Sequence, residues 1–526
     1  MKEKINIVWY KKDLRVSDHK PLYEACKDNL PVIALYVREP TIMQASDYSH
    51  FHQYWIQESL KDLKLSLTNI YIPLLMRYGE VSQILHIISD IYDIWCIYSH
   101  EETGNNLTYM RDIYIAKYCK NNNIVFLEYP NNAVVRKLAN RDERDTIWKE
   151  RIFDNILPIP NVRNIFILQE SLLQLSKKSF LWFVPVKKPV ARTYSRDLPW
   201  EKAWFSRLMY FLSHAGAYRY ALSRPELSTK DSSRLSAYIT YGNISIRQVY
   251  QFSNQKVLEL SDQAKNSNFV EEKKSINRQV MSLVAFRSRI HRHCHFIQKL
   301  ESQPSIEFTN QNNAFDNIRT EIDDNLINLR YRGQTGIPMI DAGMRCLQVS
   351  GWINFRMRAT LVSFVCNTCM QPWQSIWPML ARLFVDYEPG IHYSQLQMQS
   401  ATTGINTIRI YNPLKQLQEK DSELFFVRKW IPEISWLTND EIYTLGTLAW
   451  NELILSKWIS YPTYIVDIIS SNKLARIALW WVKKTDQSKT EARKVYQKLG
   501  SRKSPVRKTS SKRKVIISQN TLFSEN

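Results

Sequence analysis

Hydroxyl groups and one arginine gather in a short run of the chain that could bind a phosphate group. Tyr220 precedes this run by twelve residues, and sequence with helical spacing follows it. The amides at a helix N-terminus and the charge-assisted hydrogen bonds of an arginine both favour anions, so the run suits a pyrophosphate. The same pattern is also typical of a capped helix with an arginine on its surface. The run consists of Ser232, Ser233, Arg234, Leu235 and Ser236.

Residues 1–130 are expected to form an α/β domain. Strands that alternate with helices predict a doubly wound parallel sheet, which places ligands at the carboxyl ends of its strands. The segment after the first strand reads KKDLRVSDH and lacks the G-x-G-x-x-G of a standard dinucleotide site. Helical patterns separate the apolar, β-rich runs INIVWY, PVIALYV, IYIPLLMRYG, DIWCIYSH and IVFLEY.

Three further regions follow the α/β domain. Residues 131–200 are rich in Pro, Arg and Lys and have weak periodicity, which predicts a long connector. Residues 201–481 show helical spacing with breaks at Pro and Gly, so they are expected to form an all-α domain. Residues 482–526 are polar and rich in Ser and Lys, which predicts a basic, disordered tail.

Composition restricts the class of protein. A chain of 526 residues with 44% hydrophobic residues can fill two or three cores. It has no apolar run of about 18 residues that could span a bilayer, and its N-terminus lacks a signal-peptide layout. Seven widely spaced cysteines fit reduced thiols better than a disulfide framework. We expect a cytoplasmic monomer without a membrane partner.

The formal charge of +21 suggests a polyanionic partner. Between Lys483 and Lys514 the chain carries thirteen Lys or Arg and two acidic residues, so about half of the charge is in the tail. The remainder still favours nucleic acid, because each phosphate that is neutralised releases counterions. A solvated, solubilising basic surface is the alternative.

Four segments, in the same order along nearly the whole chain, resemble the photolyase and cryptochrome family. Matches of this length are far more specific than a lone glycine motif. The resemblance implies an N-terminal α/β domain and a helical domain that binds FAD in a folded-back, U-shaped form. The segments are VWYKKDLRVSDH, SSRLSAYITYGNIS, GQTGIPMIDAGMRCLQVSGWINFRMRATLVSF and LFVDYEPGIHYSQLQMQSATTGINTIRIYNPLKQLQEKD.

The resemblance also assigns roles to residues. Tyr220 and the run 232–236 would hold the diphosphate of FAD, and Arg358 would pair with Asp386 beside the isoalloxazine ring. An arginine and a carboxylate near the ring bias its electronics, while the cofactor supplies the chemistry. An ordinary ion pair between helices is the alternative. The residues expected along the ring and ribose are Asp386, Tyr387 and Glu388.

His392 occupies the position expected to face flavin N5, where family members that repair DNA commonly carry Asn. A neutral imidazole can donate one hydrogen bond to N5, whereas a protonated one would favour the anionic reduced flavin. Alternatively, the imidazole is turned away from the ring, since one inserted residue in YEPGIHY would move it.

The family's tryptophan relay for photoreduction keeps only its middle member here, Trp373. The other two positions are Leu396 and Arg330. A different electron path is open, although a tryptophan in helical sequence is more often part of a core. Its candidates are Trp352, Trp377 and Tyr393.

The residues expected around a flipped pyrimidine lesion also differ. Dimer-repairing relatives have a Glu, two Trp and an Asn, and the paired histidines of (6-4) photoproduct repair are absent as well. Arginine planes can stack on bases and bind phosphate, so the basic run RSRIHRHCHF could still contact DNA. The expected DNA contacts are Arg289, Arg292 and Arg356. The lesion positions hold Arg289, Arg292, Met398 and Phe355, and the histidine-pair stretch reads Asn354 and Phe355.

Two further cofactor sites can be tested against the sequence. Cys366 and Cys369 could suggest an iron–sulfur cluster, but the pair lies in an apolar helical stretch, which favours small buried thiols and no metal. A second, antenna chromophore of unknown identity is expected in the N-terminal domain near Lys11, Asp13 or Glu101.

The leading hypothesis is a blue-light-absorbing FAD protein that repairs pyrimidine lesions in UV-damaged DNA by electron transfer from reduced flavin, as a deoxyribodipyrimidine photolyase-type lyase. The lesion is not assigned. A cryptochrome-like light sensor without repair activity is the first alternative. A nucleic-acid-binding protein with a degenerate cofactor site is the second.

Overall fold

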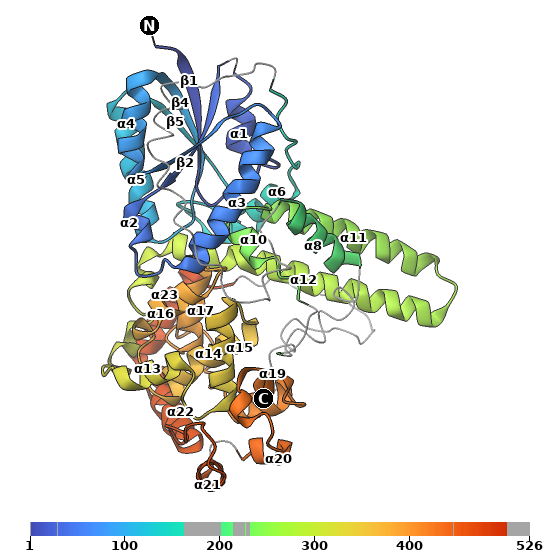
Figure 1. The fold of residues 1–526 in the computed structure, drawn as a ribbon, viewed down its shortest axis with the longest axis vertical. Coiled ribbons are helices and arrows are strands. Elements are labelled where there is room, and N and C mark those ends of the chain that lie inside the picture. The colour runs from blue at the N-terminus through green and yellow to red at the C-terminus, as the bar shows by residue number, and fades with distance from the viewer. Residues whose placement is uncertain are drawn as a thin grey trace.

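The computed structural model describes residues 2–28, 30–162, 201–213, 227, 232–444 and 447–501. These residues form an α/β sheet domain and a larger helical domain that adjoins it (Figure 1). Tyr220, the later part of the predicted connector and the last residues of the basic tail lie outside the described residues.

The α/β domain is built on a five-stranded sheet in which all pairings are parallel. The strand order is β3-β2-β1-β4-β5, so the first strand lies in the centre. The strands are β1 (Lys4–Tyr10), β2 (Val32–Arg38), β3 (Leu74–Tyr78), β4 (Asp93–His100) and β5 (Val125–Tyr129). The helices are α1 (Lys20–Ala25), α2 (Pro40–Met43), α3 (His50–Thr68), α4 (Val81–Ile91) and α5 (Asn106–Asn121).

Both faces of the sheet are covered, which explains why its strands are apolar throughout. Ile7 and Trp9 of β1 belong to one core with residues of α4 and α5. Val8 and Tyr10 point the other way, into a second core with residues of α1 and α3. A parallel sheet buried on both sides shows near-continuous apolar runs. The prediction of a doubly wound parallel-sheet domain is confirmed.

The rest of the described chain is helical, as predicted. Its single large core joins residues from most of its helices. The first half comprises α8 (Glu201–Ser213), α10 (Ser236–Thr240), α11 (Ile246–Asn266), α12 (Val270–Ser302), η3 (Pro304–Glu307), η4 (Asn313–Ile318), α13 (Asp324–Arg332), α14 (Pro338–Ser350), α15 (Phe355–Ser363) and the π-helical turn η5 (Phe364–Thr368). The second half comprises η6 (Trp373–Ser375), α16 (Trp377–Leu383), α17 (Pro389–Gln399), α18 (Pro413–Lys420), α19 (Phe425–Trp430), η7 (Pro432–Ile434), α20 (Asn439–Ile442), α21 (Leu448–Ser456), α22 (Ile468–Lys484) and α23 (Asp486–Leu499).

Two predicted segments are more ordered than the sequence suggested. The start of the connector contains η1 (Arg141–Glu143) and α6 (Arg144–Phe153), which packs on α11 through backbone carbonyls that accept from Arg247 and Gln251. The prediction of disorder from residue 482 onward is wrong for α23. That helix buries Val495 and Leu499, because its apolar residues recur at helical spacing within the charged sequence.

Gly242 is the point at which the backbones of the two domains approach most tightly among the described glycines. Gly242 has φ +68°, and a Cβ atom there would lie 2.4 Å from the Cα of Asp13. Around this contact the backbone N–H of Leu14 donates to the carbonyl of Tyr241 (3.0 Å), and the Arg15 guanidinium donates to the carbonyl of Gly242 (3.1 Å). Only glycine allows this approach, so the segment after β1 is fixed against the helical domain. Among the described helices, none is long and apolar enough to cross a membrane.

Candidate functional site

Arg358 and Asp386 form the ion pair that the resemblance implied. The Nη2 atom of Arg358 donates to both carboxylate oxygens of Asp386, at 3.0 and 2.9 Å. Its Nε atom donates to the carbonyl of Ile353 at 2.9 Å, and its guanidinium lies 4.3 Å from the ring centre of Phe384. The Asp386 side chain is buried. The pair is therefore held on three sides, which orients a buried charge.

The local sequence explains how the two charges meet. Gly351 ends α14 in the left-handed conformation, with φ 64°. Its carbonyl accepts a hydrogen bond from the N–H of Val385 at 2.9 Å, which draws the turn before α17 against the end of α14. The side chain of Asn354 then caps α15 by accepting from the N–H of Met357 (2.9 Å). Arg358 follows one helical turn later and faces Asp386.

Two polar atoms of the predicted flavin residues are buried without a hydrogen-bond partner in the described part of the protein. They are the hydroxyl of Ser232 and the Oε1 atom of Glu388. Burial raises the pKa of Glu388 to about 7, while the charge of Lys12 lowers it. Buried polar groups are rarely left unsatisfied in folded proteins. A ligand that accepts a hydrogen bond from Ser232 and donates one to Glu388 fits these positions, so the residues present are compatible with a bound flavin.

The phosphate run is positioned by α8. The Arg207 guanidinium donates to the carbonyls of Ser233 (3.0 Å) and Ser232 (3.3 Å). Arg234 has φ 56°, and its guanidinium stacks over the ring of Trp352 at 3.5 Å from the ring centre. The run is thereby joined to the segment that carries Arg358. This stacking was not predicted, because the sequence shows only that Trp352 follows Gly351 in the third matched segment.

His392 is buried on α17 among aromatic rings. Its Nε2 atom lies 3.1 Å from the carbonyl of Trp377, and burial lowers the pKa of His392 to about 3. The imidazole is thus neutral at ordinary pH. Because a carbonyl only accepts, the single N–H of His392 is used on Trp377. The predicted donation from a neutral His392 to flavin N5 would require this bond to break, and the contact with N5 stays a prediction.

An aromatic chain joins three candidates for an electron path. The Tyr393 ring lies 6.3 Å from Trp373 and 5.4 Å from Trp377, measured between ring centres. Trp373 is buried and donates from Nε1 to the side-chain oxygen of Asn310 at 2.8 Å. Leu396 is buried on α17. These ring contacts are consistent with an electron path through Tyr393. Trp352 was the other candidate that the sequence offered for such a path.

Arg330, at the other substituted relay position, places a charged side chain inside the helical domain. Its side chain is fully buried, and its three guanidinium nitrogens have no hydrogen-bond partner among the described residues. Burial lowers the pKa of Arg330 to about 10. Burial also raises the thiol pKa of Cys366 to about 11 and of Cys369 to about 12, so both thiols are neutral. Two neutral thiols do not compensate the charge of Arg330.

The predicted DNA contacts lie on two helices. Arg289 and Arg292 are half-buried on α12. Arg356 is half-buried on α15, with its guanidinium 5.3 Å from the ring centre of Tyr411. Phe355 beside it is exposed, and Met398 on α17 is half-buried. The structure thus presents an exposed aromatic ring and a stacked arginine next to the Arg358 segment.

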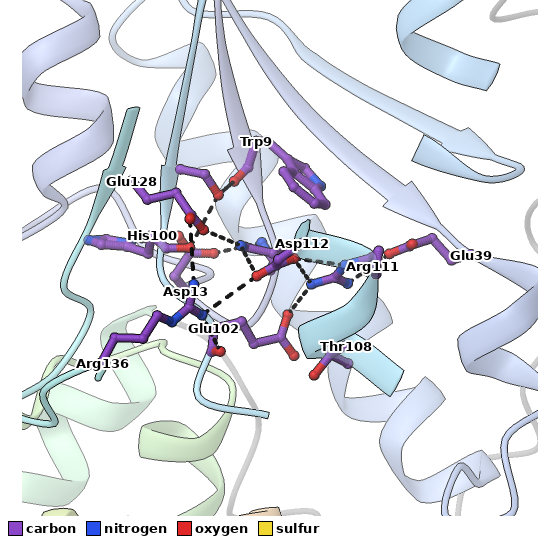
Figure 2. A network of polar contacts seen from close by, with 12 residues as sticks. Trp9, Asp13, Glu39, His100, Glu102, Thr108, Arg111, Asp112, Glu128 and Arg136 are labelled. Atoms are coloured by element: carbon purple, nitrogen blue, oxygen red, sulfur yellow. Dashed lines mark hydrogen bonds and ion pairs between the residues drawn. The ribbon is translucent and has the colours of Figure 1, made fainter. Parts of the chain in front are cut away.

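A different polar cluster lies at the carboxyl ends of β1 and β4 (Figure 2). Asp13 Oδ2 lies 2.9 Å from His19 Nε2 and 2.7 Å from His100 Nδ1, and its Oδ1 accepts from the N–H of Lys11 at 2.7 Å. His19 Nδ1 accepts from the N–H of Leu22 (3.1 Å), so its proton is on Nε2 and is donated to Asp13. Among the described residues, this is the one group of three His, Cys, Asp or Glu side chains close enough to hold a metal. The proton on His19 Nε2 indicates a hydrogen-bonded cluster instead.

A network of ion pairs extends from this cluster (Figure 2). Lys11 donates to Asp112 at 3.0 Å. Arg111 forms ion pairs with Glu39 (2.9 Å), Glu102 (2.6 Å) and Asp112 (2.8 Å). The charges of these carboxylates hold the pKa of Arg111 well above its usual value, despite burial that lowers it. Lys11 and Asp13, which were expected near an antenna chromophore, are therefore already bonded to protein groups.

Two open pockets flank this network. One lies between the domains and is lined by Asp13, Glu101, Gly242, His293 and Glu388, among others. The other opens at the ends of β1 and β2, with about 870 Å³ of empty space that includes its solvent-exposed mouth. Its lining includes the aromatic residues Tyr10, Tyr36, Tyr48, His52, Tyr241 and Tyr387. Aromatic walls with a few charged groups are typical of sites for flat organic molecules.

The described residues thus form a parallel-sheet domain fixed to a helical domain that holds a buried Arg–Asp pair. The family model described as the FAD binding domain of DNA photolyase matches residues 286–480, and the DNA photolyase model matches residues 6–144. Together they cover more than half of the chain. The chain therefore belongs to the photolyase and cryptochrome family, and its helical domain is the family's FAD-binding domain.

Individual relatives agree with this assignment. The chain is 23% identical to the deoxyribodipyrimidine photo-lyase of Buchnera aphidicola over 485 residues, which covers 89% of this chain and 96% of the relative. The crystal structure of a Synechocystis cryptochrome has the same fold with a TM-score of 0.74 at 20% identity, covering 91% and 99% of the two chains. An archaeal photolyase from Sulfolobus tokodaii, described with two FAD molecules, gives 0.70 at 21% identity and covers 90% and 99%. Photolyases and cryptochromes are thus similar to this chain to a comparable degree.

Proposed function

We propose that this protein repairs UV-induced pyrimidine lesions in DNA, using light absorbed by FAD. Reduced FAD, when bound, supplies the excited-state electron that splits such a lesion. The contribution of the protein is to hold the cofactor, bind the damaged strand and exclude water from the site. The proposal names no lesion type, because the positions expected to contact the lesion carry other residues here than in the relatives that repair DNA.

The flavin would be held from two sides in this proposal. The run 232–236, fixed by Arg207, would bind the diphosphate, together with Tyr220. Glu388 would accept hydrogen bonds from the cofactor, and Tyr387, which also lines the pocket at the ends of β1 and β2, would form the wall between the flavin and that pocket. Arg358 and Asp386 would set the electrostatic field at the ring, because the carboxylate compensates the arginine within the buried site.

One observation carries the repair proposal. Arg356 is half-buried on α15, with its guanidinium 5.3 Å from the ring centre of Tyr411, and Phe355 beside it is exposed. Such an arginine can bind phosphate while the exposed ring offers a stacking surface for a base. The other two stacked arginines, Arg234 on Trp352 and Arg358 on Phe384, lie in the proposed flavin site.

The direct test is a repair assay on the photoreduced protein. Oligonucleotides that carry either a cyclobutane dimer or a (6-4) photoproduct are illuminated with blue light, and the products are separated by chromatography. We expect one of the two lesions to be restored, and Arg356→Ala should weaken binding of the damaged strand about tenfold through loss of a phosphate contact. If neither lesion is restored under blue light, the repair proposal fails.

We also propose that an antenna chromophore binds in the pocket at the ends of β1 and β2. The aromatic lining and the Arg111 and Glu39 pair support a flat molecule with polar edges. A second chromophore would show as an absorption band in addition to that of FAD. Replacing Tyr48 by Ala should remove that band and leave the FAD spectrum unchanged, whereas loss of both bands would contradict separate sites.

A light sensor without repair activity is the second candidate. It is favoured by Arg330 and Leu396, which replace relay positions, and by the contact of the Ser501 hydroxyl with His295 Nε2 (3.2 Å), where the basic tail leaves the helical domain. In this case illumination should alter proteolysis of the tail. Identical digestion in light and dark, together with repair of either lesion, would exclude it.

A further inference from the structure

α22 exposes an apolar face to solvent. Its inner side packs into the domain through Ala475 and Leu479, and Asn472 accepts a hydrogen bond from Thr368 at 2.7 Å. The outer side carries large apolar residues, with Trp481 72% and Leu474 66% exposed. Such residues normally face the core of a helix-packed domain. The full set on this face is Ile469, Leu474, Ile477, Trp480 and Trp481.

Basic side chains are interleaved with these apolar ones. α22 has four Lys or Arg and no Asp or Glu. Three of these basic side chains are exposed: Lys473, Arg476 and Lys484. With Trp480 they follow one another at intervals of three or four residues, so they share one side of the helix. The exposed face of α22 is therefore both apolar and positively charged.

Other exposed apolar residues lie in the elements that precede α22 in the chain. α20, α21 and α22 lie together at the end of the molecule opposite the sheet domain (Figure 1). Trp458, just after α21, is 93% exposed, and Leu455 and Trp436 are exposed as well. Among the described residues, four of the five exposed tryptophans lie between positions 436 and 481. An apolar surface concentrated at one end of a protein marks an interaction site.

We propose that the exposed face of α22 binds an anionic lipid surface. Helices that lie in a membrane interface combine Trp, Leu or Ile with Lys and Arg, and their binding increases with anionic lipid. Lys473, Arg476 and Lys484 would contact headgroup phosphates. Trp481 and its apolar neighbours would enter the boundary between headgroups and acyl chains.

Lipid accounts for this surface better than nucleic acid does. Ile469, Leu474 and Ile477 are aliphatic and offer no ring on which a base could stack. They can, however, enter the apolar part of a bilayer. The association would be peripheral, since no described helix can span a membrane. It differs from the sequence-based expectation of no membrane partner, and it does not depend on the proposed repair function.

Vesicle co-sedimentation of the full-length protein tests the proposal. Vesicles of phosphatidylcholine alone are compared with vesicles that also contain phosphatidylglycerol. The full chain should sediment with the anionic vesicles only. The triple variant Leu474→Gln, Ile477→Gln and Trp481→Gln should partition at least about tenfold more weakly, because three apolar side chains are lost from the interface.

A matched control removes three exposed apolar residues elsewhere. Leu258→Gln, Phe269→Gln and Met281→Gln lie on α11, α12 and the turn between them, and all three residues are exposed in the structure. This variant should sediment like the wild type. Thermal unfolding of both triple variants verifies that they remain folded.

Three results would overturn the proposal. The first is no sedimentation of the wild type with anionic vesicles. The second is sedimentation that survives in the α22 triple variant but is lost when the tail residues Lys512, Arg513 and Lys514 are replaced by Gln, which would assign binding to the tail. The third is a wild type that does not bind vesicles but binds single-stranded DNA, with that binding lost in the α22 triple variant.

Discussion

The polar contacts of Asp13 and Arg111 in the α/β domain and three buried polar residues of the helical domain differ in how completely they are satisfied. In the α/β domain, both carboxylate oxygens of Asp13 accept hydrogen bonds, and Arg111 contacts three carboxylates. In the helical domain, Ser232, Glu388 and Arg330 each have buried polar atoms without a partner among the described residues. A satisfied network stabilises the fold, whereas unpartnered buried groups weaken the fold unless a ligand meets them. The difference separates residues that build the scaffold from residues that are available for binding.

The largest effect is expected when the satisfied network is broken at Asp13. Asp13→Ala leaves the N–H groups of His19 and His100 buried without their acceptor and removes a contact beside Gly242. Loss of one member of a buried charged network costs about 3–5 kcal/mol. We expect the free energy of unfolding, measured with a chemical denaturant, to fall by about that amount.

Asp486→Ala is the matched control for this substitution. The Asp486 carboxylate pairs with Lys489 on the surface, where its side chain is 98% exposed. Exposed ion pairs contribute little, so this variant should unfold like the wild type. Equal free energies of unfolding for the two variants would mean that the Asp13 cluster does not stabilise the fold.

The second effect concerns the pH dependence that Glu388 causes without flavin. Its folded pKa is raised from 4.5 to about 7, so folding favours the protonated form. The protonated Glu388 therefore stabilises the folded protein fully below pH 4.5, the pKa of the unfolded chain. This stabilisation is lost as the pH rises through about 7, the pKa in the folded protein. Glu388→Gln should remove it, so the variant should gain about 3 kcal/mol relative to wild type between pH 4.5 and pH 8.

Unfolding of the flavin-free protein is measured at several pH values for this comparison. Glu39 and Glu301 also have raised pKa values, about 7, and they are present in both proteins. The difference between wild type and variant therefore isolates Glu388. A difference that does not change with pH would show that Glu388 is ionised normally and already has a partner.

The third effect is a gain of stability at Arg330. Arg330→Met removes a buried charge without a partner, and replacing a buried charge by a well-packed apolar side chain often stabilises a protein by about 1–2 kcal/mol. The paired variant is Arg319→Met. Arg319 donates to the carbonyl of Cys366 and to Asn367 Oδ1 (2.8 Å), so its loss should destabilise the protein instead.

Denaturant midpoints of these two variants give opposite signs if the distinction between partnered and unpartnered charges holds. A lower midpoint for Arg330→Met would mean that its guanidinium has a partner in solution. Retained light-driven reduction of bound flavin in the same variant would indicate that the electron path does not use this position.

Long motifs made the fold and part of the site predictable from sequence. The apolar strand runs and the segment containing Arg358 and Asp386 gave the two domains and the ion pair, because periodicity and motif length are local properties. The contacts of His392 with Trp377 and of Arg234 with Trp352 were not predicted, since they depend on how separate helices pack. Helix α23 was missed for the opposite reason, because its high charge obscured its few buried residues.

The smallest stability effect is expected at Ser232, and it tests the comparison most directly. Its hydroxyl is buried and has no partner among the described residues, so Ser232→Ala should leave the stability of the flavin-free protein unchanged or raise it by about 0.5 kcal/mol. If the hydroxyl instead binds the flavin diphosphate, the same substitution should weaken flavin affinity about fivefold, as measured by fluorescence titration. Ser213 is exposed at the end of α8, outside the run, and Ser213→Ala provides a control for general disturbance of the helix that positions the run. A loss of stability without a loss of affinity at Ser232 would assign its hydroxyl to the scaffold, and the distinction between satisfied and unpartnered polar groups would then fail at Ser232.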